Sequence, residues 1–198
     1  MNFEEIKNNL ETKIIGIAGA GGLGSNCAVA LARVGIGKLI ISDFDIVEES
    51  NLNRQYFFYN QIGEKKVDAL KKNINKINPE VTVEIHNIKL TAETIIDFYK
   101  NCDIIIEAFD QASQKQMIIE TVLTAFPKKV LISALGIAGF GKNNIIKARK
   151  DGNLYICGDE KTEVNNEEPP LAPRVGIIAN MQANVAIDIL LNKNLKEL

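Results

Sequence analysis

One short run constrains the fold more than any other: GAGGLG at residues 19–24 lies between a strand-like and a helix-like segment. The stretch before it, Lys13–Ala18, is apolar and typical of a buried strand, and Ser25–Val34 has apolar residues at helical spacing. Such a turn lets phosphates approach the backbone and the free N–H groups at the helix start. We therefore predict a phosphate-binding strand–turn–helix unit. Its glycines are Gly19, Gly21, Gly22 and Gly24.

Strand-like and helix-like segments alternate along the following hundred residues. The predicted strands are Lys38–Ser42, Val81–Ile88, Cys102–Glu107 and Val130–Ser133. The predicted helices are Gly63–Ile77, a segment from Thr91 to about Tyr99, and Gln111–Phe126. This alternation predicts a parallel sheet with helices on both faces.

The pattern changes toward the C-terminus. The segments Asn144–Ala148 and Leu154–Cys157 flank Asp151-Gly152, which predicts a hairpin. A polar loop, Asp159–Pro173, and an apolar closing helix, Val175–Leu191, follow. We therefore expect a single α/β domain over residues 1–198, with a Rossmann-like, mostly parallel sheet and added antiparallel strands near the C-terminus.

Composition narrows the classes of partner. A net charge of −2 argues against general nucleic-acid binding, and no apolar run approaches the length of a membrane span. The polar, acidic start, Met1–Lys13, is unlike a signal peptide, so we expect a cytoplasmic protein with no nucleic-acid or membrane partner. Cys27, Cys102 and Cys157 form no CxxC pair, so no zinc is expected.

An acidic residue follows the second predicted strand, where a nucleotide would place its ribose. Asp43 ends that strand and can accept hydrogen bonds from ribose hydroxyls, and Asp45 joins it among the cofactor-binding candidates. The glycine turn and this acid also fit a nicotinamide-dependent dehydrogenase. A tight turn that binds no ligand is the third alternative.

The run DFDIVEESNLNRQ at residues 43–55 favours a triphosphate over a dinucleotide. Arg54 offers a planar fork of donors for phosphate oxygens, and Asn51 and Gln55 can orient phosphates without changing the charge. Lys66 supplies a point charge near a helix start. Asp110 follows the fourth predicted strand, where it can hold Mg²⁺ bridging phosphate oxygens.

Each of these charged residues also has a plainer alternative. Arg54 could form a surface ion pair. Lys66 could belong to a solvated helix face, and Asp110 could only cap the helix that follows it. All of them lie at the same predicted edge of the sheet, which favours a common role.

These motifs together resemble the ThiF/MoeB/HesA family, relatives of the ubiquitin-activating enzymes. The resemblance runs from about Lys13 to Leu191 and rests on GAGGLGS, DFDIVEESNLNRQ, GEKKV and the aspartate of EAFDQ. The closing APRVGI at residues 172–177 and QAN at residues 182–184 are similar to a shorter ThiF-like branch linked to thiamin synthesis.

The resemblance implies an activity: Mg²⁺- and ATP-dependent adenylation of the C-terminal glycine of a small ubiquitin-like sulfur carrier that ends in Gly-Gly. By this resemblance Asp43 holds the ribose, Arg54 and Lys66 hold the triphosphate, and Asp110 binds Mg²⁺. Asn51 and Gln55 would lie beside the reacting phosphate. One alternative within the family is a member that binds nucleotide or carrier without turnover. Another is ATP-dependent dehydration of a tRNA base, which the acidic balance of the chain disfavours because it gives tRNA little to bind.

The resemblance also implies features that this chain shares only in part. Family members usually form two-fold dimers, so a homodimer is expected, and the apolar closing helix and Tyr56–Tyr59 offer surfaces for one. Longer members carry an N-terminal arginine, for which Lys7 or Lys13 would have to substitute. Some members use a loop cysteine to take the carrier covalently; Cys157 is the nearest candidate, although it also fits a strand end.

Overall fold

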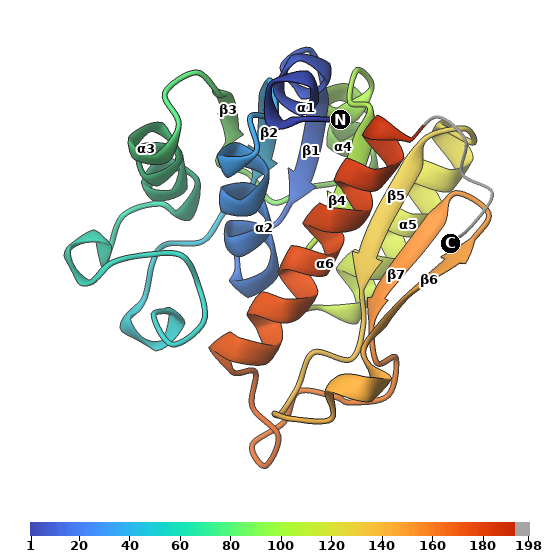
Figure 1. Ribbon diagram of the computed structural model, residues 1–198. Coiled ribbons are helices and arrows are strands. Elements are labelled where there is room, and N and C mark those ends of the chain that lie inside the picture. Colours follow the sequence, from blue (N-terminus) through green and yellow to red (C-terminus); the bar gives the residue numbers. More distant parts are fainter. Residues whose placement is uncertain (193–198) are drawn as a thin grey trace.

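The structure is a computed structural model that describes residues 1–192, and its centre is one seven-stranded sheet (Figure 1). The strand order is β3-β2-β1-β4-β5-β7-β6. The strands are β1 Ile14–Ala18, β2 Lys38–Ser42, β3 Thr82–His86, β4 Ile104–Glu107, β5 Val130–Ala134, β6 Lys147–Asp151 and β7 Leu154–Gly158. Because the chain reverses its direction of progress across the sheet between β1 and β4, the carboxyl ends of these strands form the switch point where α/β proteins collect ligands.

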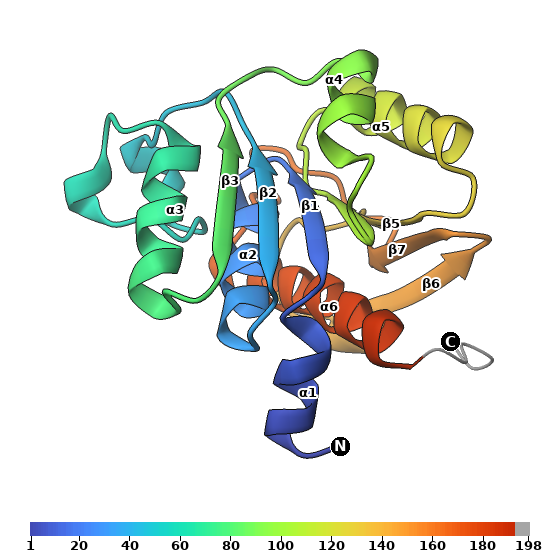
Figure 2. The ribbon, with the colours of Figure 1, turned by 90° about the horizontal axis from the view of Figure 1, so that it is seen from above.

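Helices cover both faces of this sheet, as the alternating pattern predicted (Figure 2). One face carries α2, α3 and α6, and the other carries α4 and α5. The helices are α1 Phe3–Leu10, α2 Gly22–Arg33, α3 Lys66–Ile77, α4 Ala92–Tyr99, α5 Ala112–Ala125 and α6 Ala172–Leu191. The sequence pattern did not predict α1, whose start is closed by a capping box between Asn2 and Glu5.

α4 packs very closely against β1 just before the glycine turn. The phenol of Tyr99 donates a hydrogen bond to the carbonyl of Ile17 at 3.1 Å and to Ser42 Oγ at 2.9 Å. A Cβ added at Gly16 would lie 2.6 Å from the Tyr99 ring, so a glycine in β1 allows α4 to pack this closely. The strand that leads into the glycine turn is therefore held closely against α4.

The C-terminal hairpin is confirmed with one refinement. β6 and β7 pair antiparallel, with Asp151 opposite Leu154, but β7 itself runs parallel to β5. Only β6 therefore opposes the rest of the sheet. Its place is also shifted: the predicted strand Asn144–Ala148 begins in the 3₁₀ turn Asn143–Ile145, and β6 starts after that turn.

The closing helix corrects the expectation that no segment is long enough to span a membrane. α6 has 20 residues, and its length and mean hydropathy alone would allow it to cross a membrane. In this fold it packs against α2 and β5, with Val175, Ile178 and Ala179 buried in the core. A helix that covers a sheet on one face has the same composition for that reason.

Candidate nucleotide-binding site

The glycine turn is tighter than its sequence alone indicated, because α2 already begins within it. Gly21 is the N-cap residue and Gly22 the first residue of α2, three residues before the predicted start. Gly19 has φ of +102°, which a residue with a side chain rarely adopts. A Cβ at Gly24 would lie 1.9 Å from the carbonyl oxygen of Gly19. Glycine is therefore required at both ends of the motif.

The start of α2 offers backbone donors to an anion. The first hydrogen bond of α2 runs from Ser25 N to the carbonyl of Gly21 at 3.0 Å. The backbone amides before Ser25, at the start of the helix, therefore have no acceptor within the helix. Ser25 Oγ donates to the same carbonyl at 2.6 Å and accepts from Tyr56 N at 2.9 Å. The turn has the geometry of an anion site at a helix N-terminus. The bond from Tyr56 N to Ser25 holds the end of the segment 51–56 beside it.

Asp43 joins β2 to the glycine turn. One of its carboxylate oxygens accepts a hydrogen bond from Ala20 N at 2.6 Å, and the other accepts from Asp45 N at 2.8 Å. Burial raises the pKa of Asp43 above its ordinary value, although these two amides and the charge of Lys66 oppose the rise. The remaining acceptor capacity of this carboxylate suits a ribose hydroxyl.

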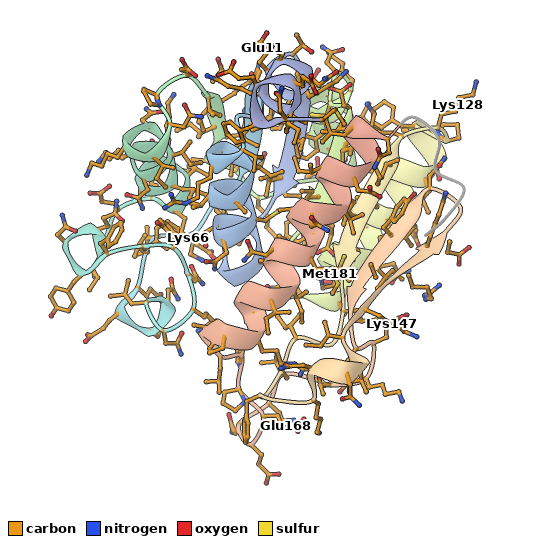
Figure 3. The ribbon with its side chains drawn as sticks, in the orientation of Figure 1. Glu11, Lys66, Lys128, Lys147, Glu168 and Met181 are labelled. Atoms are coloured by element: carbon orange, nitrogen blue, oxygen red, sulfur yellow. The ribbon has the colours of Figure 1, made fainter. Side chains whose placement is uncertain are left out.

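Lys66 is buried at the first turn of α3 rather than free in solution (Figure 3). Its Nζ lies 2.7 Å from Asp45 Oδ2, and its backbone amide donates to the Asp45 carbonyl at 2.9 Å. Helix α3 starts here and not at Gly63, because residues 63–65 form a turn and a short bridge to Ile46. The alternative of a solvated lysine is therefore wrong, and a phosphate would have to share this ammonium group with Asp45.

The segment around Arg54 lies against the glycine turn. Arg54 Nη1 donates to the carbonyl of Ser50 at 3.2 Å and to Asn53 Oδ1 at 2.7 Å. Its Cγ is 3.5 Å from the position that a Cβ at Gly22 would take. No carboxylate is among these acceptors, so the guanidinium keeps its net charge for another anion.

Asn51 and Gln55 flank Arg54 in the same segment. Asn51 is buried, and its Oδ1 accepts from the backbone amide of Glu48 at 3.1 Å. The amide nitrogen of Gln55 is 3.8 Å from the position of a Cβ at Gly21. Within residues 1–192, Gln55 Oε1 is buried without a hydrogen-bond partner. An unpaired amide beside a phosphate-binding turn is what a site that receives a polar ligand would contain.

Asp110 lies in the loop after β4. Its neighbour Phe109 has a ring carbon 3.5 Å from the position of a Cβ at Gly19. Asp110 itself is exposed. Across the described part of the chain, no three His, Cys, Asp or Glu side chains are grouped to hold a metal. The single exposed carboxylate of Asp110 is a ligand type that Mg²⁺ uses, because this ion takes one or two carboxylates and completes its shell with phosphate oxygens and water.

The structure also contains buried charges that the sequence patterns did not indicate. Glu107 at the end of β4 forms an ion pair with Lys115 of α5, and Asp159 forms one with Arg174 of α6. Glu107, Asp159 and Arg174 are almost fully buried. The one sequence signal was their position, because Glu107 and Asp159 each stand at or just beyond the carboxyl end of a strand.

All three cysteines are buried and none forms a disulfide. Burial raises the pKa of Cys157 to about 12 and also raises that of Cys27, where the nearby Cys157 adds to the effect. Burial raises the pKa of Cys102 to about 12. The thiolate is the nucleophile, so the strand-end interpretation of Cys157 is favoured over a catalytic one.

The fold and the glycine turn at its switch point place the chain in the class of α/β proteins with a Rossmann-like sheet. The profile of the ThiF family matches residues 3–198, and the chain belongs to that family. It is 32% identical over 185 residues to adenylyltransferase and sulfurtransferase MOCS3 of Caenorhabditis briggsae, which is 89% of this chain and 45% of that protein.

A second relative is ubiquitin-like modifier-activating enzyme 5 of Bombyx mori, 43% identical over 104 residues, or 52% of this chain and 25% of that protein. The chain therefore spans less than half the length of these relatives. Among solved structures, Escherichia coli tRNA N6-threonylcarbamoyladenosine dehydratase TcdA in complex with ATP superposes with a TM-score of 0.87. That match covers 96% of this chain and 90% of that one at 21% identity, which shows a shared fold.

Proposed function

We propose that this protein uses ATP and Mg²⁺ to adenylate the C-terminal glycine of a small ubiquitin-like sulfur carrier of the ThiS type, and that it serves thiamin biosynthesis in the cytoplasm. The observation that carries the proposal is that Arg54 and Gln55 lie against the glycine turn and that Asp43 joins this turn to the Lys66–Asp45 pair, while Asp110 follows β4 at the same edge of the sheet. Relatives named as adenylyltransferases and ubiquitin-like modifier-activating enzymes support this reaction over hydride transfer.

In this proposal the chain's own residues bind and orient the reactants. Asp43 receives the ribose, the α2 amides and Arg54 receive the phosphates, and Asp110 would hold Mg²⁺, which neutralises phosphate charge when bound. The carrier carboxylate forms a bond to the α-phosphorus while the bond to the β-phosphate oxygen breaks and pyrophosphate leaves. Such a step depends on positioning and charge stabilisation and needs no protein base.

The carrier and the oligomeric state are the finer parts of the proposal. The resemblance of residues 172–177 and 182–184 to the thiamin-linked branch supports a ThiS-like carrier, and family membership supports a homodimer. The segment Tyr56–Tyr59 divides in the structure: Phe57 is buried, whereas Phe58 and Tyr59 are 52% and 73% exposed. These two rings are surfaces that a second copy or the carrier could cover.

ATP–pyrophosphate exchange tests the reaction. With Mg²⁺ and a carrier that ends in Gly-Gly, we expect exchange of labelled pyrophosphate into ATP that depends on both proteins. The matched control is the same carrier without its two terminal glycines, which leaves no carboxylate in reach. If ATP binds but no such carrier supports exchange, the adenylation proposal is wrong and a binding role without turnover takes its place.

The thiols give a prediction about the route of transfer. We expect native protein to react with iodoacetamide at least about a hundredfold more slowly than urea-unfolded protein, because the thiols are buried and un-ionised. Intact-mass spectrometry counts the alkylated sites over time. Rapid alkylation of Cys157 in the native protein would contradict its buried, inert position and reopen a thioester route.

A further inference from the structure

A buried ion pair lies beneath the loop that carries Asp110. Glu107, the last residue of β4, is fully buried, and Lys115 lies in α5 with a side chain that is 17% exposed. Lys115 Nζ donates to both carboxylate oxygens of Glu107 at 2.9 Å. A pair this deep costs more desolvation than a surface pair, so its geometry has to be well satisfied.

Both members of the pair have further bonds at the same edge of the sheet. Glu107 Oε1 accepts from the backbone amide of Phe109 at 2.6 Å, and Glu107 Oε2 accepts from Ser133 Oγ. Lys115 Nζ also donates to the carbonyl of Ala134 at 3.0 Å. The network therefore joins the turn after β4, the first half of α5 and the end of β5.

These bonds fix the backbone on both sides of Asp110. On one side, Ala108 N donates to the carbonyl of Ala18 at 2.9 Å, and Phe109 N is held by the Glu107 carboxylate. On the other side, α5 begins at Ala112 and is tied to Glu107 through Lys115. Asp110 is therefore confined between two anchored points while its own side chain stays exposed.

The stability of the core is not a sufficient reason for a buried ion pair at this place. Replacing a buried pair by apolar residues is often neutral or stabilising, so stability is a weak reason for a pair at this place. Side chains that orient a metal ligand from behind are a common feature of metal sites, and their loss typically costs about 10- to 100-fold in metal affinity.

We propose that the Glu107–Lys115 pair positions Asp110 for the Mg²⁺ that accompanies the nucleotide. The inference rests on the nucleotide site of the proposed function but not on the identity of the carrier. Glu107 and Lys115 are positioning residues, since their charged groups bond to each other and to Phe109, Ser133 and Ala134. Their effect on nucleotide binding should therefore depend on both the metal and Asp110.

Titration calorimetry with ATP, in Mg²⁺ and in excess EDTA, tests this dependence without any turnover. Lys115→Met should weaken binding about tenfold in Mg²⁺ and less than about twofold in EDTA. Lys115→Arg, which keeps the charge and the bonds to Glu107, is the matched control and should stay within about threefold of the unaltered protein. In an Asp110→Asn background, Lys115→Met should have no further effect.

Three outcomes would overturn the proposal: equal weakening with and without Mg²⁺, additive effects of Lys115→Met and Asp110→Asn, or no metal-dependent ATP binding by the unaltered protein. If Lys115→Met fails to fold, Ser133→Ala replaces it, because it removes one bond to Glu107 without leaving an unpaired charge. Its loss of affinity must likewise appear in Mg²⁺ and vanish in the Asp110→Asn background. Metal-selective effects in a protein that shows no pyrophosphate exchange would retain this inference and reject only the adenylation reaction.

Discussion

Replacing Arg54 with alanine is expected to lower ATP–pyrophosphate exchange at least about a hundredfold while leaving the protein folded. The stem of the Arg54 side chain lies against the glycine turn, with its Cγ 3.5 Å from the position of a Cβ at Gly22. Its hydrogen bonds in the structure go to a carbonyl and an amide oxygen, so its charge is available to stabilise a polyphosphate. Without the guanidinium, the phosphate charge loses a partner whose planar set of donors a lysine does not reproduce.

The fold should survive because the backbone of Arg54, not its side chain, fastens this segment. Asn26 Nδ2 donates to the carbonyl of Arg54 at 2.9 Å, and alanine keeps that acceptor. Arg33→Ala is the matched control, since Arg33 is exposed in the last turn of α2, away from the glycine turn. Exchange kinetics and thermal unfolding of both variants check the prediction. Unchanged exchange in Arg54→Ala would remove the phosphate role.

The second large effect is expected from Gly24→Ala, which adds one methyl group. A Cβ at this position would lie 1.9 Å from the carbonyl oxygen of Gly19 and 3.3 Å from the Ala108 side chain. The carbonyl belongs to the backbone, so relief requires α2 to move away from β1. We expect a loss of about 2–4 kcal/mol in the free energy of unfolding and loss of measurable ATP binding.

Gly176→Ala in α6 supplies the control for this substitution. An added Cβ there has no atom within 4 Å, and the helix interior favours alanine over glycine. This variant should gain about 0.5–1 kcal/mol and keep its ATP affinity. Urea unfolding measures the two free energies and calorimetry the affinities. Equal stability of the two variants would show that the turn can relax and that Gly24 is not required by packing.

Local patterns were sufficient to predict the elements that build the site. Short apolar runs marked the strands of the parallel sheet, and the topology of such sheets brings their carboxyl ends together. The sequence therefore predicts that Asp43, Arg54 and Asp110 share one edge of the sheet. The glycine turn is also predicted, but the predicted helix starts at Ser25, whereas α2 starts at Gly22. The first turn of a glycine-rich helix has few side chains, so it shows no hydrophobic period in the sequence.

The pairing of charges could not be predicted in the same way. Lys66 is buried against Asp45, and Lys115 against Glu107, although each lysine stands in a segment with polar neighbours. The methylene stem of a lysine can lie along apolar surface while its ammonium group reaches either solvent or a buried carboxylate. Which of the two it reaches depends on the packing between segments that are distant in the sequence. The same holds for Arg174 of α6, whose partner Asp159 comes from the loop after β7.

The return of α6 across the sheet affects how a ribosome-bound chain can mature. Gln182 donates to the carbonyl of Glu107 at 3.0 Å, and Val175 would touch a Cβ at Gly22 at 3.0 Å. The glycine turn and β4 thus receive their last supports from the final helix of the described chain. When the ribosome has translated only the first 110 residues, the nascent chain contains every residue proposed to bind ATP. It still lacks α6, which supports the glycine turn and β4. Until α6 emerges from the exit tunnel, the apolar face that it will cover is open to chaperones.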